Sequence, residues 1–329
     1  MPAPLLYLKS RVCQLGLCLL SLPGVGVAAP AEPMVSFFTE SPGRMGIRLG
    51  EQRIATYVWE DPAIPRPYFC NVFAPDGTRI TRTHPPDPVA DKDNMDHAEF
   101  HPGIWLAFGD LGGADFWRLK ARVRHVEFST KPTPTREGGA FSVVNVYETL
   151  EEPPREIAQE TCIYSIQPDG NGYCLSAESI FKATQNGVAF GDQEEMGFGI
   201  RLGTPVTVKH GSGTMRNSAG GVNEAGTWGK QAEWCAASGV VEGHRAGAML
   251  AQVHGPVQPS WFHSRDYGLM VANAFGKKSM TAPDDDSVAP EAMQLEKGEE
   301  LKLGFALYIF SMADEGEPDY SAIRERLRL

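Results

Sequence analysis

The sequence has no two cysteines at the C-x-x-C spacing, although it contains six cysteines among 329 residues. Structural zinc sites usually hold two thiolates at that spacing, so no structural zinc is expected. Four cysteines lie beyond residue 31, namely Cys70, Cys162, Cys174 and Cys235. They could form disulfides in any of three pairings, or they could be free buried thiols. Cys162 and Cys174 flank an expected hairpin turn and would face each other across it.

Long apolar runs are missing as well. A membrane-spanning helix needs about 20 consecutive apolar residues. The apolar run at 12–22 is shorter, follows Lys9 and Arg11, and precedes the small residues Ala29-Pro30-Ala31. This pattern is typical of a secretory signal peptide. We therefore expect residues 1–31 to be a signal peptide and residues 32–329 to form one secreted or periplasmic domain without a membrane span.

Positive charge is scarce. Lysine and arginine number 30 against 41 aspartates and glutamates, which gives a formal net charge of −11. A surface with this balance disfavours nucleic acids and anionic membranes as partners. The expected partner is a small molecule or an oligosaccharide.

Helical periodicity is also nearly absent. Short alternating segments separated by Gly/Pro turns recur along the chain, and the residues from Leu301 to Ile309 are apolar at every second position. Only the tail has helical spacing, at Tyr320, Ile323 and Leu327. The pattern predicts an all-β fold, an antiparallel β-sandwich with a short C-terminal helix. Because sandwiches with open edges often associate, a homo-oligomer stays open.

The chain has one stretch that is especially dense in chemically able groups, at residues 96–117, which begins D-H-A-E-F-H-P-G-I-W. His97 and His101 are four apart, but Pro102 and Gly103 follow at once. These two residues disfavour a helix and favour a loop that enters a buried strand at 104–108. Loops on rigid scaffolds often carry function. The alternative is that His97 caps a turn and His101 bonds the backbone.

Two later stretches carry further candidates. The segment 216–230 reads R-N-S-A-G-G-V-N-E-A-G-T-W-G-K, which lacks the phosphate-binding loop pattern but has residue types typical of a sugar site. The segment 260–268 reads S-W-F-H-S-R-D-Y-G and places a histidine near an arginine and an aspartate. For both, the alternative is a rigid turn with a core tryptophan and mutually paired charges.

Taken in order, the motifs D-H-x-x-x-H-P-G-I-W, G-D-x-x-G-x-D-F-W, R-N-S-x-G-G-V-N-E-x-G-T-W-G-K and W-F-H-S-R-D-Y-G resemble the bacterial PmoA-like family of unknown function. The resemblance covers roughly residues 66–310, and members often carry the label methane oxygenase. It implies a mostly β fold similar to sugar-mutarotase sandwiches and a place among sugar-degradation proteins. Many relatives have an Asp-His-Pro-His-His run, where this chain has Ala98, Glu99 and Phe100 between its two histidines.

The resemblance and the residue types together give a set of candidate site residues. The catalytic candidates are His97, His101, Glu224, His263, Arg265 and Asp266. The substrate-binding candidates are Arg66, Tyr68, Arg201, Asn223, Trp228, Lys230 and Trp261.

Three functions are compatible with these residues. The leading hypothesis is an exported carbohydrate-active enzyme that acts on a sugar or glycoside by hydrolysis, elimination or isomerisation. In it, His97 or His263 transfers a proton with Glu224 as partner, and Trp228 stacks on the sugar ring. The second is a divalent-metal enzyme, compatible with the oxygenase label, with His97, His101 and His263 as ligands. The third is a non-catalytic glycan-binding module.

Overall fold

The computed structural model describes residues 1–2, 35–135 and 137–327. The expected signal peptide at 1–31 lies almost entirely outside these ranges, so it stays a prediction. None of the described helices is both long and apolar enough to cross a membrane.

The first large sheet has nine strands, and all of their pairings are antiparallel. Their order across the sheet is β1 (Val35–Ser41), β2 (Arg44–Leu49), β3 (Gln52–Val58), β4 (Tyr68–Cys70), β5 (Ile104–Phe108), β11 (Met196–Arg201), β17 (Leu269–Asn273), β16 (Ser260–Arg265) and β13 (Lys230–Ala232). The strand expected to follow the His97 loop is confirmed as β5 with the bounds predicted.

The second large sheet has eight strands, also antiparallel. Their order is β12 (Thr214–Asn217), β14 (Cys235–Val241), β15 (His244–His254), β19 (Glu300–Ser311), β9 (Gly172–Ala183), β8 (Glu156–Asp169), β7 (Gly138–Thr149) and β6 (Ala121–Thr135). A small ladder joins β10 (Val188–Phe190) to β18 (Met293–Leu295). The predicted antiparallel β-sandwich is confirmed.

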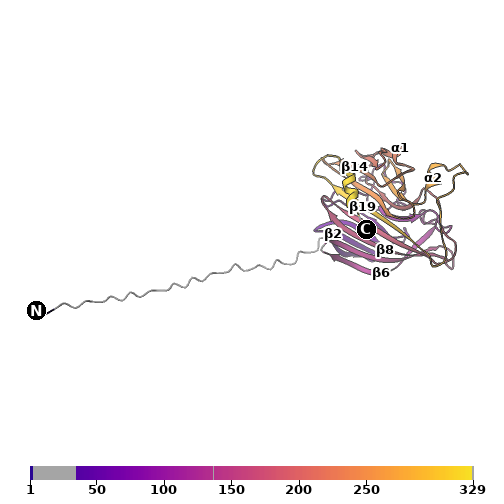
Figure 1. Ribbon diagram of the computed structural model, residues 1–329, viewed down its shortest axis with the longest axis horizontal. Coiled ribbons are helices and arrows are strands. Elements are labelled where there is room, and N and C mark those ends of the chain that lie inside the picture. The colour runs from indigo at the N-terminus through magenta and orange to yellow at the C-terminus, as the bar shows by residue number, and fades with distance from the viewer. Residues whose placement is uncertain (3–34, 136, 328–329) are drawn as a thin grey trace. The chain divides into compact units, whose positions relative to one another are not determined.

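Three short helices complete the described chain. They are α1 (Asn223–Thr227), α2 (Lys277–Thr281) and the C-terminal α3 (Tyr320–Arg326), with a 3₁₀ turn at Thr204–Val206. Figure 1 shows α1 and α2 in one part of the domain, away from β6 and β8. The prediction that only the tail is helical was therefore too narrow, because single helical turns are too short to produce a 3.6-residue period.

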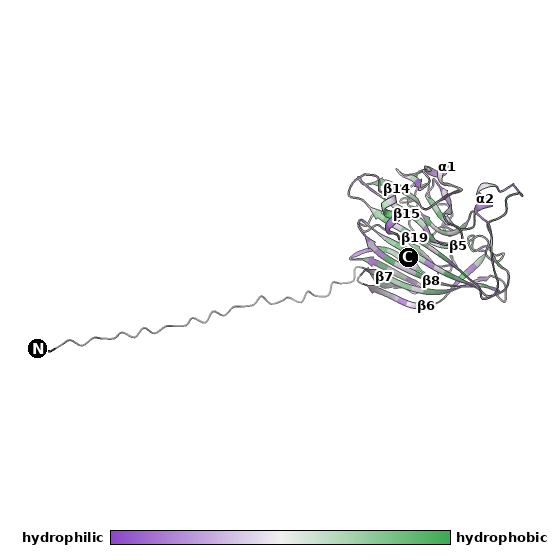
Figure 2. Ribbon diagram, in the orientation of Figure 1, coloured by the Kyte–Doolittle hydropathy of each residue, from purple (hydrophilic) through white to green (hydrophobic). Residues whose placement is uncertain are grey.

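The core lies between the two sheets. Alternate residues of β5 point into it, namely Ile104, Leu106 and Phe108, while Trp105 belongs to the opposite face. Phe198 of the first sheet stacks on Phe305 of the second, with ring centroids 5.3 Å apart. Each buried aromatic ring of this kind contributes roughly 1.5–3 kcal/mol. Figure 2 shows hydrophobic colour on the strands β5 and β15 and hydrophilic colour on α1 and α2.

We call the face of each sheet that is turned away from the core its outer face. On the second sheet, α3 covers part of the outer face. Tyr320, Ile323 and Leu327 pack there with Tyr308 and Phe310 of β19 in a separate apolar cluster. The helical spacing seen in the tail is thus confirmed as the buried side of α3.

The cysteines do not form the cross-hairpin pair. Cys70, Cys162, Cys174 and Cys235 are free and buried thiols in the described part of the chain. The β8–β9 hairpin does form, but its register places Cys162 opposite Ser179 and Cys174 opposite Gln167. Cys162 points into the core and Cys174 into the cluster under α3. The expectation that they face each other is wrong, because they lie on opposite faces of the sheet.

The outer face of the first sheet carries one continuous row of side chains across seven strands. Successive partners in this row are Arg44, Val58, Tyr68, Trp105, Gly199, Val271 and His263. A Cβ atom on Gly199 would lie only 3.0 Å from Trp105 Cζ2, so glycine at this position lets the indole lie across the strand. Loops close over this row, and among them Ile64 and Trp117 belong to the same apolar cluster as Trp105.

Candidate functional site

The candidate site begins with His97, in the loop that leads into β5. Its side chain is 50% exposed, and its backbone has φ +51°. Left-handed backbone is uncommon in residues other than glycine, and such positions concentrate at functional sites. His97 Nδ1 lies 2.6 Å from Asp96 Oδ2. The pair therefore presents an imidazole whose orientation is fixed by a carboxylate.

Asp96 is held in turn by Arg201, which comes from the end of β11. Arg201 Nη2 donates to Asp96 Oδ1 and to Asn94 Oδ1, each at 2.5 Å. Burial alone would raise the pKa of Asp96, but the charge of Arg201 and the hydrogen bond from His97 lower that pKa below its ordinary value. Arg201 itself is fully buried. It therefore supports the Asp96–His97 pair from behind rather than lining an open pocket.

A second buried guanidinium fixes the backbone of the same loop. Arg82 Nη1 donates to the carbonyls of Asn94 (2.9 Å) and Asp96 (2.6 Å). Its Nη2 donates to the carbonyls of His97 (2.9 Å) and His101 (3.1 Å). Four carbonyls of one loop thus depend on one side chain, which was absent from the candidates taken from the sequence.

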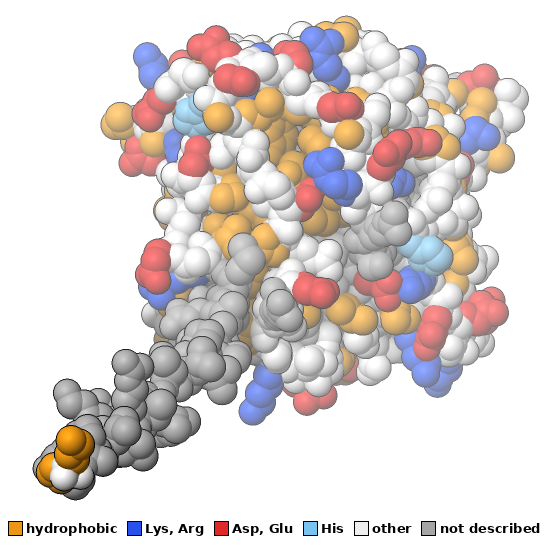
Figure 3. Space-filling view, turned by 60° about the vertical axis from the view of Figure 1, so that its left-hand side comes forward, with side chains coloured by type: hydrophobic (Ala, Val, Ile, Leu, Met, Phe, Trp, Pro, Cys, Tyr) orange, Lys and Arg blue, Asp and Glu red, His pale blue; other side chains and the backbone are white. Residues whose placement is uncertain are grey.

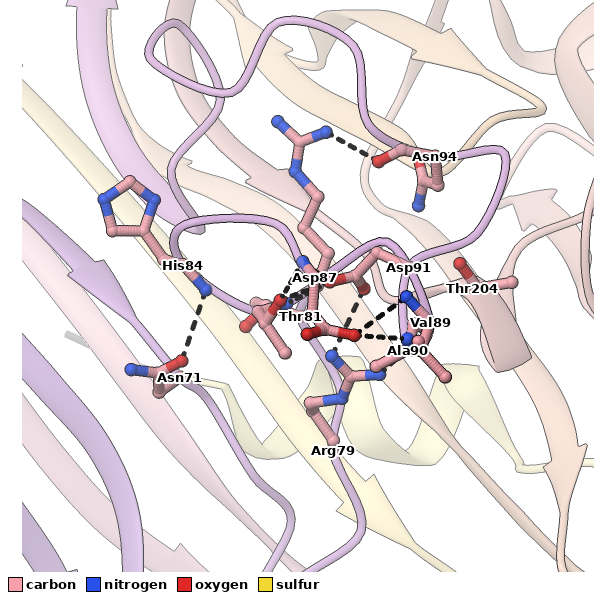
Figure 4. A network of polar contacts seen from close by, with 12 residues as sticks. Asn71, Arg79, Thr81, His84, Asp87, Val89, Ala90, Asp91, Asn94 and Thr204 are labelled. Atoms are coloured by element: carbon pink, nitrogen blue, oxygen red, sulfur yellow. Dashed lines mark hydrogen bonds and ion pairs between the residues drawn. The ribbon is translucent and has the colours of Figure 1, made fainter.

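The turn before this loop is pinned by Asp91 (Figure 4). Its buried carboxylate accepts from the backbone N–H of Thr83 at 3.0 Å and of Asp87 at 3.1 Å, and from Arg79 Nη1 at 3.2 Å. A carboxylate that accepts several hydrogen bonds rigidifies the chain around it. The loop is therefore anchored on both sides of Arg82.

The buried ring of His101 packs beside the ring of His97. Its ring stacks on Trp105 with centroids 5.0 Å apart and an interplanar angle of 13°. Its Nδ1 accepts from Arg201 Nη1 at 3.5 Å. Burial, with the charge of Arg201, lowers the pKa of His101 well below its ordinary value, which keeps the ring neutral. His101 is buried, so the structure gives it a supporting position rather than one that faces solvent.

A second group of charges surrounds Arg265 of β16. Arg265 Nη2 donates to Glu194 Oε2 and Nη1 donates to Glu224 Oε1, each at 3.2 Å. The guanidinium carbon lies 5.0 Å from the centre of the Trp228 ring, a cation–π contact. The structure thus brings together Glu224, Trp228 and Arg265, as expected, and adds Glu194.

Asp266 is tied to the backbone at the start of α1. Its Oδ1 accepts from the Glu224 backbone N–H at 2.7 Å, and Glu224 Oε2 accepts from the Asp266 backbone N–H at 3.0 Å. This reciprocal pair resembles a capping arrangement and fixes the Glu224 carboxylate. Asp266 therefore positions Glu224.

Tyr267 joins the two groups. Arg201 lies 4.1 Å over its ring. Burial raises the pKa of Tyr267, while the charges of Arg201 and Arg265 act in the opposite direction. The phenol therefore stands within the field of both guanidinium groups. The sequence reasoning did not select Tyr267, although its place directly after Asp266 in the W-F-H-S-R-D-Y-G motif was a signal that could have found it.

His263 lies under Glu194 and is only 3% exposed. Its Nδ1 donates to the Glu194 carbonyl at 3.0 Å. Burial, with the charge of Arg265, lowers the pKa of His263 to about 3. A neutral, covered imidazole is a poor proton donor at neutral pH. The structure gives His263 a positioning contact with Glu194.

Two hollows open beside Arg265. One, of about 370 Å³, is lined by Glu224, Trp228, Lys230 and Met280. The other, of about 780 Å³, is lined by Arg118, Glu194, Lys278 and other residues. Both volumes are typical of sites that bind small molecules. The two carboxylates that share Arg265 therefore face different hollows, with α2 residues at both.

The remaining candidates make contacts elsewhere. Arg66 is buried and donates to the carbonyls of Phe116, Trp117 and Phe100. The Tyr68 hydroxyl donates to Asp61 Oδ2 at 2.6 Å. Asn223 Oδ1 accepts from the Met215 backbone N–H, and Trp261 Nε1 donates to Glu291 Oε2. Each of these four side chains is therefore already engaged by a partner within the protein.

The expected metal ligands are not assembled. Within residues 35–135 and 137–327, no three His, Cys, Asp or Glu side chains are placed to hold one metal ion. His101 Nδ1 faces the cationic Arg201, and His263 donates to a carbonyl under Glu194. The expected set of His97, His101 and His263 is therefore not brought together among the described residues.

Comparisons with known proteins show similarity to a protein family and to a solved structure. No curated protein matches the sequence. The galactose mutarotase related enzyme from Lactobacillus acidophilus is similar at 10% sequence identity and a TM-score of 0.35, covering 87% of this chain and 100% of that one. The model of a family of unknown function, DUF6807, matches residues 44–319. Since that match spans most of the sequence, the chain belongs to the family of unknown function DUF6807.

Proposed function

We propose that this protein is a carbohydrate-active enzyme in which His97, oriented by Asp96, transfers a proton to or from a bound sugar. The observation that carries the proposal is the Asp96–His97 contact of 2.6 Å, on an imidazole that is half exposed. A carboxylate on one ring nitrogen leaves the other, Nε2, as the atom that meets a substrate. Hydrolysis, elimination and isomerisation of a sugar all need such a proton transfer.

The Arg265 group supports the choice of a sugar. Glu224, Trp228 and Lys230 line a hollow of about 370 Å³. An indole offers an apolar face to a sugar ring, and the carboxylate and ammonium groups hydrogen-bond to hydroxyls. The Tyr267 ring lies under Arg201, which holds Asp96, and Tyr267 directly follows Asp266, which is bonded to Glu224. We place the sugar over Tyr267, between the two groups.

One observation favours the non-catalytic alternative. Arg265 forms ion pairs with both Glu194 and Glu224 at 3.2 Å, and such a charge-assisted group is suited to hydrogen bonding with sugar hydroxyls. A glycan-binding module would need no proton transfer at all. The two candidates differ in their dependence on His97, since only the enzyme needs it.

Two sequence-based proposals accompany this one. We propose that the protein is exported, on the pattern of residues 1–31, and that the motifs at residues 96–117, 216–230 and 260–268 place it with the PmoA-like proteins that they resemble. N-terminal sequencing of the protein isolated from its native cells tests the first. An intact Met1 on all of the protein would contradict it.

The test of the proposed function uses the His97→Gln variant with His254→Gln as matched control. His254 is exposed at the end of β15 on the other sheet. A panel of neutral sugars and glycosides is screened for binding by calorimetry and for conversion by NMR. We expect His97→Gln to lose about 10²-fold or more in turnover while binding persists, with His254→Gln unchanged.

Each result separates the candidates. Conversion that is equal in the wild type and His97→Gln would remove His97 from the mechanism. Sugar binding without conversion by the wild type would favour the glycan-binding module. No binding and no conversion of any sugar would contradict the proposal as a whole.

A further inference from the structure

The charged side chains around Arg265 form ion pairs with one another. Arg265 contacts Glu194 and Glu224. Arg118, on the wall of the larger hollow, contacts Glu195 and also Asp115 at 3.3 Å. Each of these guanidinium groups thus faces two carboxylates. Acidic and basic side chains are both scattered over the face of the molecule shown in Figure 3.

The buried arginines are also held by groups of the protein, and both lie near the Asp96 carboxylate. Arg201 contacts Asp96, and the two terminal nitrogens of Arg82 donate to four carbonyls. Of the charged residues that line the smaller hollow, the exposed Lys230 has no ion pair within the described residues. It shares this hollow with Glu224. An incoming anionic group would therefore meet carboxylates wherever it met a guanidinium.

We infer that the site takes a neutral sugar and discriminates against the matching uronic acid, an inference that rests on the proposed function. A hydroxyl group can accept from Arg265 and donate to Glu224 at the same time. A carboxylate can only accept, so it would lie beside Glu194 and Glu224 with like charge. The carboxylates that pair with the guanidinium groups thus disfavour the binding of anionic ligands.

The experiment is a calorimetric titration of the full protein with matched pairs. The pairs are glucose with glucuronate, galactose with galacturonate, and mannose with mannuronate. We expect the neutral member of at least one pair to bind at least about tenfold more tightly than its uronate. Added salt should weaken the discrimination, because it screens the repulsion.

Charge variants sharpen the result. Glu194→Gln frees one edge of Arg265, so uronate affinity should rise relative to the neutral sugar. Glu325→Gln is the matched control, because it removes one exposed carboxylate from α3 on the other sheet. Lys230→Gln removes the cation that has no ion pair, so uronate affinity should fall relative to that of the neutral sugar.

The outcomes are distinct. A neutral preference that shrinks in Glu194→Gln but not in Glu325→Gln supports the inference. Uronates that bind as tightly as neutral sugars, or a preference unchanged in Glu194→Gln, would overturn the inference while the proposed function stands. No binding of any of the six sugars would overturn this inference, while conversion of another sugar in the broader screen would still uphold the proposed function.

Discussion

The outer faces of the two sheets are closed in different ways. On the second sheet, α3 lies over apolar side chains, and Ile323 and Leu327 meet Phe310. On the first sheet, charged groups lie at buried positions, among them Arg82 of a covering loop and Arg201 at the end of β11. Apolar cover stabilises by burial alone, whereas buried charge costs desolvation and is kept where geometry matters. The difference indicates that the first sheet carries the site.

The largest expected effect on stability comes from removing a buried charged side chain from the loops over the first sheet. Replacing Arg82 with Ala leaves four loop carbonyls without their donor. The free energy of unfolding should fall by about 4 kcal/mol, as for other buried charged networks that lose one partner. Urea denaturation measures it. The exposed Arg155→Ala should change it by less than about 0.5 kcal/mol, and an equally small change in Arg82→Ala would contradict the role of this side chain.

The next effect is a dependence of the free energy of unfolding on pH that comes from His263 of the first sheet. The folded pKa of His263, about 3, lies below its unfolded value near 6.5. The folded protein therefore binds fewer protons, and this contribution is present above pH 6.5 and is lost as pH falls toward 3. From pH 6.5 to 4 the wild type should lose about 3 kcal/mol more than His263→Asn, which keeps a donor for the Glu194 carbonyl.

This dependence is measured by urea denaturation at stepped pH values. His210→Asn serves as the control for removing a histidine. Parallel pH curves for the wild type and His263→Asn would show that His263 is not held neutral by its surroundings.

The smallest of these effects tests the apolar cover. Ile323→Ala in α3 should lower the free energy of unfolding by about 2 kcal/mol, because it removes buried methyl groups beside Phe310. It should leave sugar binding at the first sheet unchanged, as calorimetry would show. A loss of binding in this variant would mean that the two faces are coupled.

Much of the fold could be read from the sequence, because a strand with one buried face repeats every two residues. The alternation from Leu301 to Ile309 lies within β19, and the expected turn at residues 168–172 joins β8 to β9. The single-turn helices α1 and α2 could not be predicted, since too few residues show a helical period.

The site could be predicted only in part. The sequence indicated His97, Glu224, Trp228 and Arg265 by residue type, and the structure groups the last three. The sequence could not show which partner each polar side chain contacts. Glu194 reaches Arg265 across 71 positions of the chain, and Arg66 turns to backbone carbonyls instead of a ligand. Such pairings depend on strand order, which periodicity does not encode.

Gly199 has a practical meaning for anyone who redesigns this surface. A side chain there would begin 3.0 Å from Trp105 Cζ2 and 3.3 Å from Val271 Cγ2, and it would tilt the indole on which His101 rests. A mutant library aimed at new ligands should therefore keep Gly199 constant. It should vary Lys230 and Thr281 instead, whose exposed side chains border the smaller hollow and can change without moving the sheet.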